Sequence, residues 1–170
     1  DRTLTMSKSE LGSIYSYDLL VVLPNPDDAK RPDNLRRLET VAQLAQSYPL
    51  TKRCNSILDV LKDMNFTLNG DDPKAYSIPQ TPEMVAQQLL LYENAGGSEA
   101  EYWMDYEYRR LRLQVEMQDY NSYEAEREMK DLVERTQALF PGAQISTVGS
   151  LPQFTVMQQY VVRGQMGSML

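Results

Sequence analysis

Apolar residues mark two stretches of the chain as β-strands. In residues 13–23 the apolar run from Leu19 to Leu23 is continuous and ends at Pro24. A run of this kind is typical of a strand that is buried on both faces and covered by helices. In residues 110–117 apolar side chains at odd positions alternate with polar ones at even positions, which predicts a strand with one buried face. Shorter strands are predicted at residues 50–54 and 143–148.

Helices are predicted where the apolar spacing changes to three or four residues. The first begins near Pro32, with Asp33 placed to cap it, and ends before Pro49. Ser56 and Asp59 form a capping-box pattern that opens a second helix. Three further helical stretches begin at Thr81, Ser98 and Asn121, and a last helix contains Leu151, Phe154, Met157 and Val161.

The predicted order of elements is β-α-β-α-α-β-α-β-α. Two strand-helix-strand halves, separated by inserted helices, indicate an α/β (α+β) fold of the ferredoxin-like, split βαβ type, with helices on one face of an antiparallel or mixed sheet. Apolar residues from Met104 to Tyr108 have the opposite parity to the following strand, so a bulge or twist near Arg109 is expected. Residues 1–12 are expected to form a flexible N-terminal segment, and residues 13–170 a single domain.

The composition narrows the chemistry that the chain can perform. Its 170 residues include 17 Lys and Arg against 24 Asp and Glu, a formal charge of −7. Nucleic acid is not an expected partner, because affinity for it comes largely from basic side chains. Histidine is absent and Cys54 is the only cysteine, which excludes Ser-His-Asp and Cys-His catalysis, His-ligated zinc and an intrachain disulfide. We therefore do not expect an enzyme, and we assign no catalytic, cofactor-binding or metal-ligating residue.

Acidic residues stand close together at residues 27–28 and 71–72, and at Asp105 with Glu107. We expect these side chains to be solvated, because a site for a hard cation needs about six converging oxygen atoms.

A second group of residues is the candidate contact surface for an apolar ligand. Methionine and amphipathic aromatic side chains adapt to varied hydrophobic ligands, and ordinary core packing is the alternative use of the same residues. The group consists of Met84, Tyr92, Tyr102, Trp103 and Met104.

Several segments together resemble the periplasmic porter domain of exporters of the resistance-nodulation-division (RND) superfamily. The resembling segments are residues 17–23 (YDLLVVL), residues 54–65 (CNSILDVLKDMN), residues 78–79 leading into 85–92 (VAQQLLLY), and residues 160–170 with Gln165 and Ser168. Their order and spacing extend the resemblance from about residue 13 to the end of the chain. It is to the MMPL-like branch, which exports hydrophobic and amphiphilic molecules and includes hopanoid and mycobacterial lipid exporters.

The resemblance implies an extracytoplasmic porter domain of a proton-driven efflux protein in a bacterial inner membrane. In that family two large periplasmic loops emerge from a bundle of membrane helices, and each folds into α/β porter subdomains. Residues 13–170 would be one porter-like domain from one of these loops, with the last helix leading toward a membrane span. The expected partners are the other periplasmic loop and the membrane helices of the same full-length chain, a hydrophobic or amphiphilic small molecule or lipid, and further copies of the intact transporter. The family's proton-relay carboxylates lie in membrane helices, so none is assigned to this chain.

A stand-alone extracytoplasmic ligand-binding or protein-interaction module is the alternative function. The longest apolar run, Leu19 to Leu23, is far shorter than the roughly 20 residues of a membrane helix. Apolar stretches of that length on both sides of the chain would favour the transporter, and polar flanking sequence would favour the module.

Overall fold

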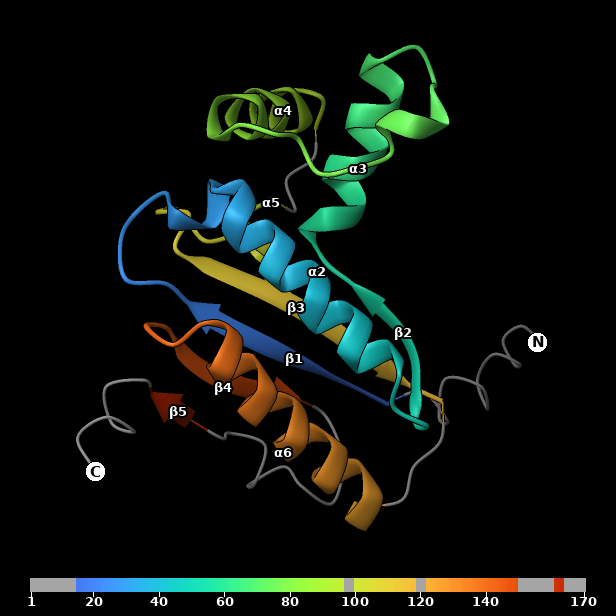
Figure 1. The fold of residues 1–170 in the computed structure, drawn as a ribbon, viewed down its shortest axis with the longest axis vertical. Coiled ribbons are helices and arrows are strands. Elements are labelled where there is room, and N and C mark those ends of the chain that lie inside the picture. Colours follow the sequence, from blue (N-terminus) through green and yellow to red (C-terminus); the bar gives the residue numbers. More distant parts are fainter. Residues whose placement is uncertain (1–14, 97–99, 119–121, 150–160, 164–170) are drawn as a thin grey trace.

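Residues 15–96, 100–118, 122–149 and 161–163 are described by a computed structural model of the chain. These residues contain one five-stranded sheet with the spatial order β2-β3-β1-β4-β5, in which all neighbouring strands are antiparallel. Two long helices, α2 (Pro32–Gln46) and α6 (Ser122–Leu139), lie side by side on one face of the sheet (Figure 1). The strands are β1 (Tyr15–Val22), β2 (Thr51–Asn55), β3 (Arg110–Met117), β4 (Gln144–Gly149) and β5 (Val161–Arg163).

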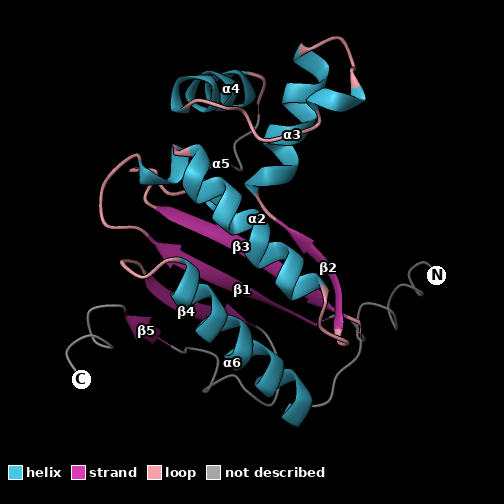
Figure 2. Cartoon of the chain, viewed as in Figure 1, coloured by secondary structure: helices cyan, strands magenta, loops and turns pink. Residues whose placement is uncertain are grey.

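The connections between the strands are those of two interleaved split βαβ units. The chain runs from β1 through α2 to β2, and β3 lies between these two strands in the sheet. It then runs from β3 through α6 to β4, and β1 lies between that second pair. This is the ferredoxin-like arrangement of an α+β fold, and β5 extends it at one edge. The predicted fold class is therefore confirmed, including the placement of both long helices on one face (Figure 2).

The hydrophobic core lies between the sheet and these two helices. Leu19 and Val21 of β1 are fully buried, and so are Leu113 and Leu111, which stand opposite them on β3. Full burial of such an aliphatic side chain contributes roughly 1.5–3 kcal/mol, so the alternating pattern is enough to fix which face of the sheet turns inward. The helices supply Leu35, Leu38 and Val41 from α2, and Ala125, Met129 and Leu132 from α6.

The opposite face of the sheet differs from the prediction for residues 13–23. Leu20 and Val22 of β1 are only half-buried, and no long helix in the described part of the chain packs over them. Their neighbours on this face are polar. One of them, Asp18, forms an ion pair with Arg112 of β3. The expectation that β1 is buried on both faces is therefore wrong, since Leu20 and Val22 are only half-buried on this face. The apolar run contributes Leu19 and Val21 to the deep core on one face of the sheet. It contributes Leu20 and Val22 to a shallower surface of mixed polarity on the other face.

The helices α3 (Ile57–Leu68) and α4 (Pro82–Asn94), inserted between β2 and β3, form a separate layer beyond one end of the sheet, whereas the one-turn α5 (Ala100–Trp103) contacts β3. In Figure 1, α3 and α4 stand clear of the strands. The predicted capping box at the start of α3 is present, since Ser56 accepts from Leu58 N at 3.1 Å and Asp59 accepts from Ser56 N at 3.1 Å. Short 3-10 turns, Asp28–Lys30 and Pro73–Ala75, complete the connections.

Two local predictions need correction. Arg31, not Asp33, is the N-cap of α2, and the Asp33 carboxylate instead pairs with Arg36 at 2.7 Å. Pro32 fixes the first helical position and lacks an N–H, so a side-chain cap is less needed there.

Val161 lies in β5, paired with Ser146 of β4, and not in the predicted last helix. The rest of that helix, the N-terminal segment 1–12, Ser98 and Asn121 lie outside the described residues.

Candidate functional site

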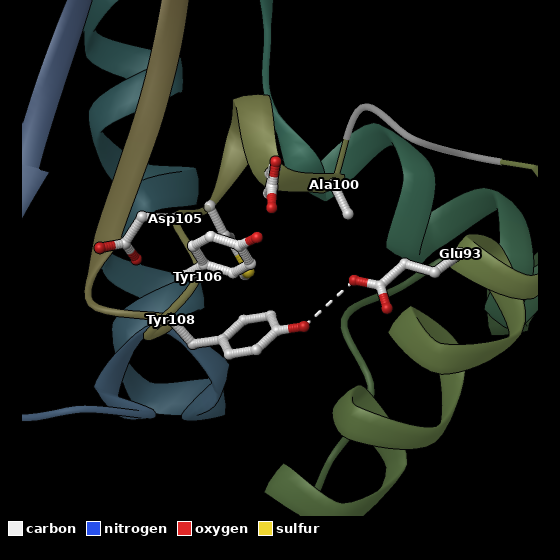
Figure 3. Close-up of a pocket in the computed structure, with 7 residues that line it drawn as sticks. Glu93, Ala100, Asp105, Tyr106 and Tyr108 are labelled. Atoms are coloured by element: carbon white, nitrogen blue, oxygen red, sulfur yellow. Dashed lines mark hydrogen bonds between the residues drawn. The ribbon is translucent and has the colours of Figure 1, made fainter.

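A cavity of about 330 Å³ lies between the inserted helices and the turn that leads into β3. One wall comes from α4 through Glu93, and another comes from α5 through Ala100 and Glu101. The turn supplies the rest of the lining. Figure 3 shows that the rings of Tyr106 and Tyr108 extend from this turn toward the side on which Glu93 lies. The described residues that line the cavity are Glu93, Ala100, Glu101, Met104, Asp105, Tyr106 and Tyr108.

The turn is shaped by Asp105. Its Oδ1 accepts hydrogen bonds from the backbone N–H groups of Arg109 at 2.7 Å and Arg110 at 3.1 Å. Tyr108 has a φ of 56°, a left-handed conformation that a bulky residue rarely adopts. Its carbonyl accepts from Ala29 N at 2.8 Å, which ties the turn to the connection after β1. The predicted bulge near Arg109 is thus a tight turn, and it directs the two tyrosine rings out of the sheet and into the cavity wall.

Tyr108 connects the turn to α4. Its hydroxyl donates a hydrogen bond of 3.1 Å to Oε2 of Glu93 (Figure 3). Burial, followed by this hydrogen bond, raises the pKa of Tyr108, so the phenol stays protonated at neutral pH. On the same ring lies the Lys30 ammonium, 4.1 Å from the ring centre, and Lys30 also pairs with Asp27 at 3.3 Å.

The charge of the cavity lining is of one sign. Among the described residues, Glu93, Glu101 and Asp105 contribute three carboxylates to the lining, and none of the lining residues is Lys or Arg. The Asp105 carboxylate points toward β3 and away from Glu93, in keeping with its role in the turn (Figure 3). Other cavities differ, because those along α6 include Arg127 and the one between α2 and α3 includes Lys62. The cavity near α4 therefore favours a positively charged group over an anion.

Only part of the predicted apolar contact surface lies at this cavity. Met104 lines it, but as a fully buried residue that bridges to Leu111 of β3. Met84, 39% exposed, lies in the first turn of α4, and the half-buried Tyr92 lies near the end of the same helix. Neither side chain lines the cavity.

Tyr102 and Trp103 face another part of the molecule. The Tyr102 ring stacks on the Arg112 guanidinium at 4.1 Å, and its hydroxyl donates to Asp18 at 3.3 Å on the open face of the sheet. Trp103 meets the Tyr102 ring edge-on at 4.9 Å and packs against the core. The five predicted residues therefore do not form one groove. They divide between the core, the helix α4 and the open sheet face.

Sequence reasoning did not select the residues that give the cavity its chemistry. Glu93 follows Tyr92 at the end of α4, and Glu101 precedes Tyr102 in α5, so each lies beside a residue that was selected for its apolar character. No local pattern marks these two acids; the Asp105 carboxylate ahead of Tyr106 and Tyr108 suits a side-chain-capped turn and marks only the turn.

The described residues show neither a metal-binding cluster nor a membrane-spanning helix. They contain no group of three or more Cys, Asp or Glu side chains arranged so that it could hold a metal ion. None of their helices combines the length and the apolar character needed to cross a membrane.

No protein-family model matches the chain, and no curated protein matches it significantly.

Proposed function

We propose that this chain is an extracytoplasmic porter domain of a proton-driven RND-superfamily exporter of hydrophobic or amphiphilic, lipid-like substrates. The supporting observation is the position of the resembling segments in the fold. Residues 17–23 form the central strand β1 and its end, residues 54–65 contain the junction of β2 with α3, and residues 85–92 form most of α4. These segments are parts of a single α+β unit with inserted helices, the architecture that the resemblance implies.

The exposed side chains of the inserted layer also support a role in handling amphiphiles. Leu90 is 57% exposed and Leu91 is 47% exposed on α4, and Leu68 at the end of α3 is 54% exposed. Large apolar side chains exposed on a layer that stands away from the sheet are accessible to another protein segment or to an apolar ligand. In the proposed exporter the second periplasmic loop and the substrate supply that partner.

The sequence on both sides of the chain in its gene gives the first test. We expect an apolar stretch of about 20 residues on each side, because the proposed domain connects two membrane helices. Polar flanking sequence on both sides would contradict the proposal and favour a stand-alone module.

A labelling experiment tests the location of the domain in the full-length protein. In a Cys54→Ser background, Leu68→Cys places a thiol on the exposed end of α3. We expect a membrane-impermeant maleimide to label this variant in cells whose outer membrane has been permeabilised. Leu61→Cys is the matched control, because Leu61 lies on the same helix and is fully buried. Labelling of Leu68→Cys only after lysis of the inner membrane would contradict the proposal.

A further inference from the structure

The cavity between α4 and the turn before β3 combines carboxylates with aromatic rings. Glu93 accepts a hydrogen bond from Tyr108, and Glu101 is an exposed residue of the cavity lining. Asp105 is engaged in the turn. Two carboxylates therefore remain to compensate a positive charge, beside two electron-rich rings and the Met104 thioether at the buried floor. Ring faces and carboxylates together are what an organic ammonium group binds best.

The chain already makes one contact of this kind. The Lys30 ammonium lies 4.1 Å from the centre of the Tyr108 ring while it pairs with Asp27. Tyr106, two residues earlier in the same turn, is 82% exposed, and no cation of the described residues lies over its ring. An ammonium in the cavity would repeat on Tyr106 the arrangement that Lys30 makes on Tyr108.

Apolar surface continues from the cavity along α4. Leu90 stands one helical turn before Glu93, on the same side of the helix, and its side chain is 57% exposed. Leu91, two residues before Glu93, is 47% exposed but faces another side of the helix. A ligand whose charged end lies beside Glu93 can therefore place an alkyl chain on Leu90 without burying its head group in an apolar site.

We infer that this cavity binds the ammonium head group of a cationic amphiphile, with its chain along α4. The inference rests on the proposed function for its biological meaning, since it specifies the class of amphiphile that the exporter would handle. The binding chemistry itself depends only on Glu93, Glu101 and the two tyrosine rings. A phosphate or carboxylate head group would meet the Glu93 and Glu101 carboxylates and no basic side chain among the described lining residues.

Binding to the 170-residue chain is measured with octyltrimethylammonium by isothermal titration calorimetry, below its micellar concentration. Octyl sulfate and octyl glucoside carry the same alkyl chain with an anionic and a neutral head group. We expect the cation to bind about tenfold or more tightly than either, and tetramethylammonium to compete with it. Far-UV circular dichroism at each ligand concentration establishes that the chain stays folded.

Variants then assign binding to the cavity. Glu101→Gln and Tyr106→Ala should each weaken octyltrimethylammonium binding by about 3- to 30-fold, in line with the loss of one charge or one cation–π contact. Glu134→Gln and Tyr123→Ala are the matched controls, since both residues are exposed on α6, and they should leave the affinity unchanged. Equal binding of the three amphiphiles, or equal affinity of the cavity and control variants, would overturn the inference.

The two proposals can fail separately. If the chain lacks apolar flanks and still binds octyltrimethylammonium through Glu101 and Tyr106, the exporter proposal fails and the ammonium site stands. If both flanks are membrane helices and the cation does not bind selectively, the exporter proposal stands and the ammonium site fails.

Discussion

The hydroxyl of Tyr108 donates a hydrogen bond of 3.1 Å to Glu93, a residue 15 positions earlier in the sequence. It is a direct side-chain link from the inserted helix α4 to the turn that begins β3. Because Tyr108 also holds a left-handed backbone conformation, the position of the turn and that of α4 depend on the same residue.

Tyr108→Phe should lower the free energy of unfolding by about 0.5–1 kcal/mol, the usual net contribution of a partly exposed hydrogen bond. Urea unfolding followed by circular dichroism measures the change. Tyr106→Phe is the control, since the Tyr106 side chain is 82% exposed, and it should be close to neutral. Equal effects of the two variants would mean that the bond to Glu93 contributes nothing to stability.

Adjacent leucines of β1 should differ sharply in their contribution to stability. Leu19 is fully buried under α2 and α6, and Leu19→Ala should cost about 2–5 kcal/mol. Leu20 is half-buried on the open face, and Leu20→Ala should cost about 1 kcal/mol. Urea midpoints of the two variants give the comparison. Similar losses at both positions would show that the open face is covered as deeply as the helical face.

Gly149 is required where β4 ends beside β1. A Cβ at this position would lie 2.7 Å from Tyr17 Cβ and 3.1 Å from Tyr17 Cα, atoms that cannot move without shifting the strand. Gly149→Ala should therefore destabilise the fold by about 1–3 kcal/mol. Gly142→Ala is the control, because its nearest atom, Pro24 Cγ, is 3.6 Å away and makes an ordinary contact. A lower thermal midpoint for Gly149→Ala alone is the expected result.

Cys54 should be a poor nucleophile in the folded chain. Burial, with smaller effects from Asp59 and Glu116, raises the pKa of its thiol to about 12. The reactive thiolate is therefore scarce, and iodoacetamide at pH 8 should react at least about a hundredfold more slowly with the folded chain than with the chain in urea. Mass spectrometry of the whole chain measures the rate of alkylation at Cys54, because Cys54 is the only cysteine. Similar rates in both states would contradict the prediction.

Glu128 should make stability fall as the pH rises. Burial raises its pKa in the folded state; its Oε1 has no hydrogen-bond partner in the described structure, and Leu50 N donates to Oε2 at a long 3.4 Å. A raised folded pKa means that this contribution is complete below the unfolded value, near 4.5, and is lost as the pH rises through the folded value.

The Glu128→Gln variant tests this pH dependence. It should melt at a higher temperature than the unchanged chain at pH 7 and at nearly the same temperature at pH 4, where the glutamic acid is itself neutral. Thermal melts of Glu134→Gln, an exposed change on the same helix, provide the baseline at each pH. A gain at pH 4 as large as that at pH 7 would assign the effect to packing instead of charge.

Local patterns in the sequence were sufficient to predict the elements that depend on local interactions. The parity of residues 110–117 predicts β3 and its buried face, because a one-residue slip would expose every apolar side chain. Ser56 and Asp59 predict the start of α3, because both capping bonds lie within one turn. The order of these elements was then enough to predict the ferredoxin-like fold.

Features that depend on tertiary contacts were not predictable in the same way. The left-handed Tyr108 is held by contacts to Ala29 and Glu93, which are distant in sequence, and no residue-level pattern indicates φ of 56° at a tyrosine. The cavity acids come from different helices, so they converge only when α4 and α5 are placed beside the turn. Apolar residues such as Met104 could equally serve a core or a surface, and burial alone decides between them.

The order of strands in the sheet has a consequence for how this chain acquires its structure. β1 is synthesised first of the described strands, yet both of its neighbours, β3 and β4, come much later, at residues 110–117 and 144–149. During synthesis its apolar residues therefore remain without the hydrogen-bonded partners β3 and β4 until most of the chain has emerged. Such long-range pairing slows folding and leaves an aggregation-prone edge open for that interval. Assembly of this sheet should therefore be sensitive to chaperones that shield extended apolar segments.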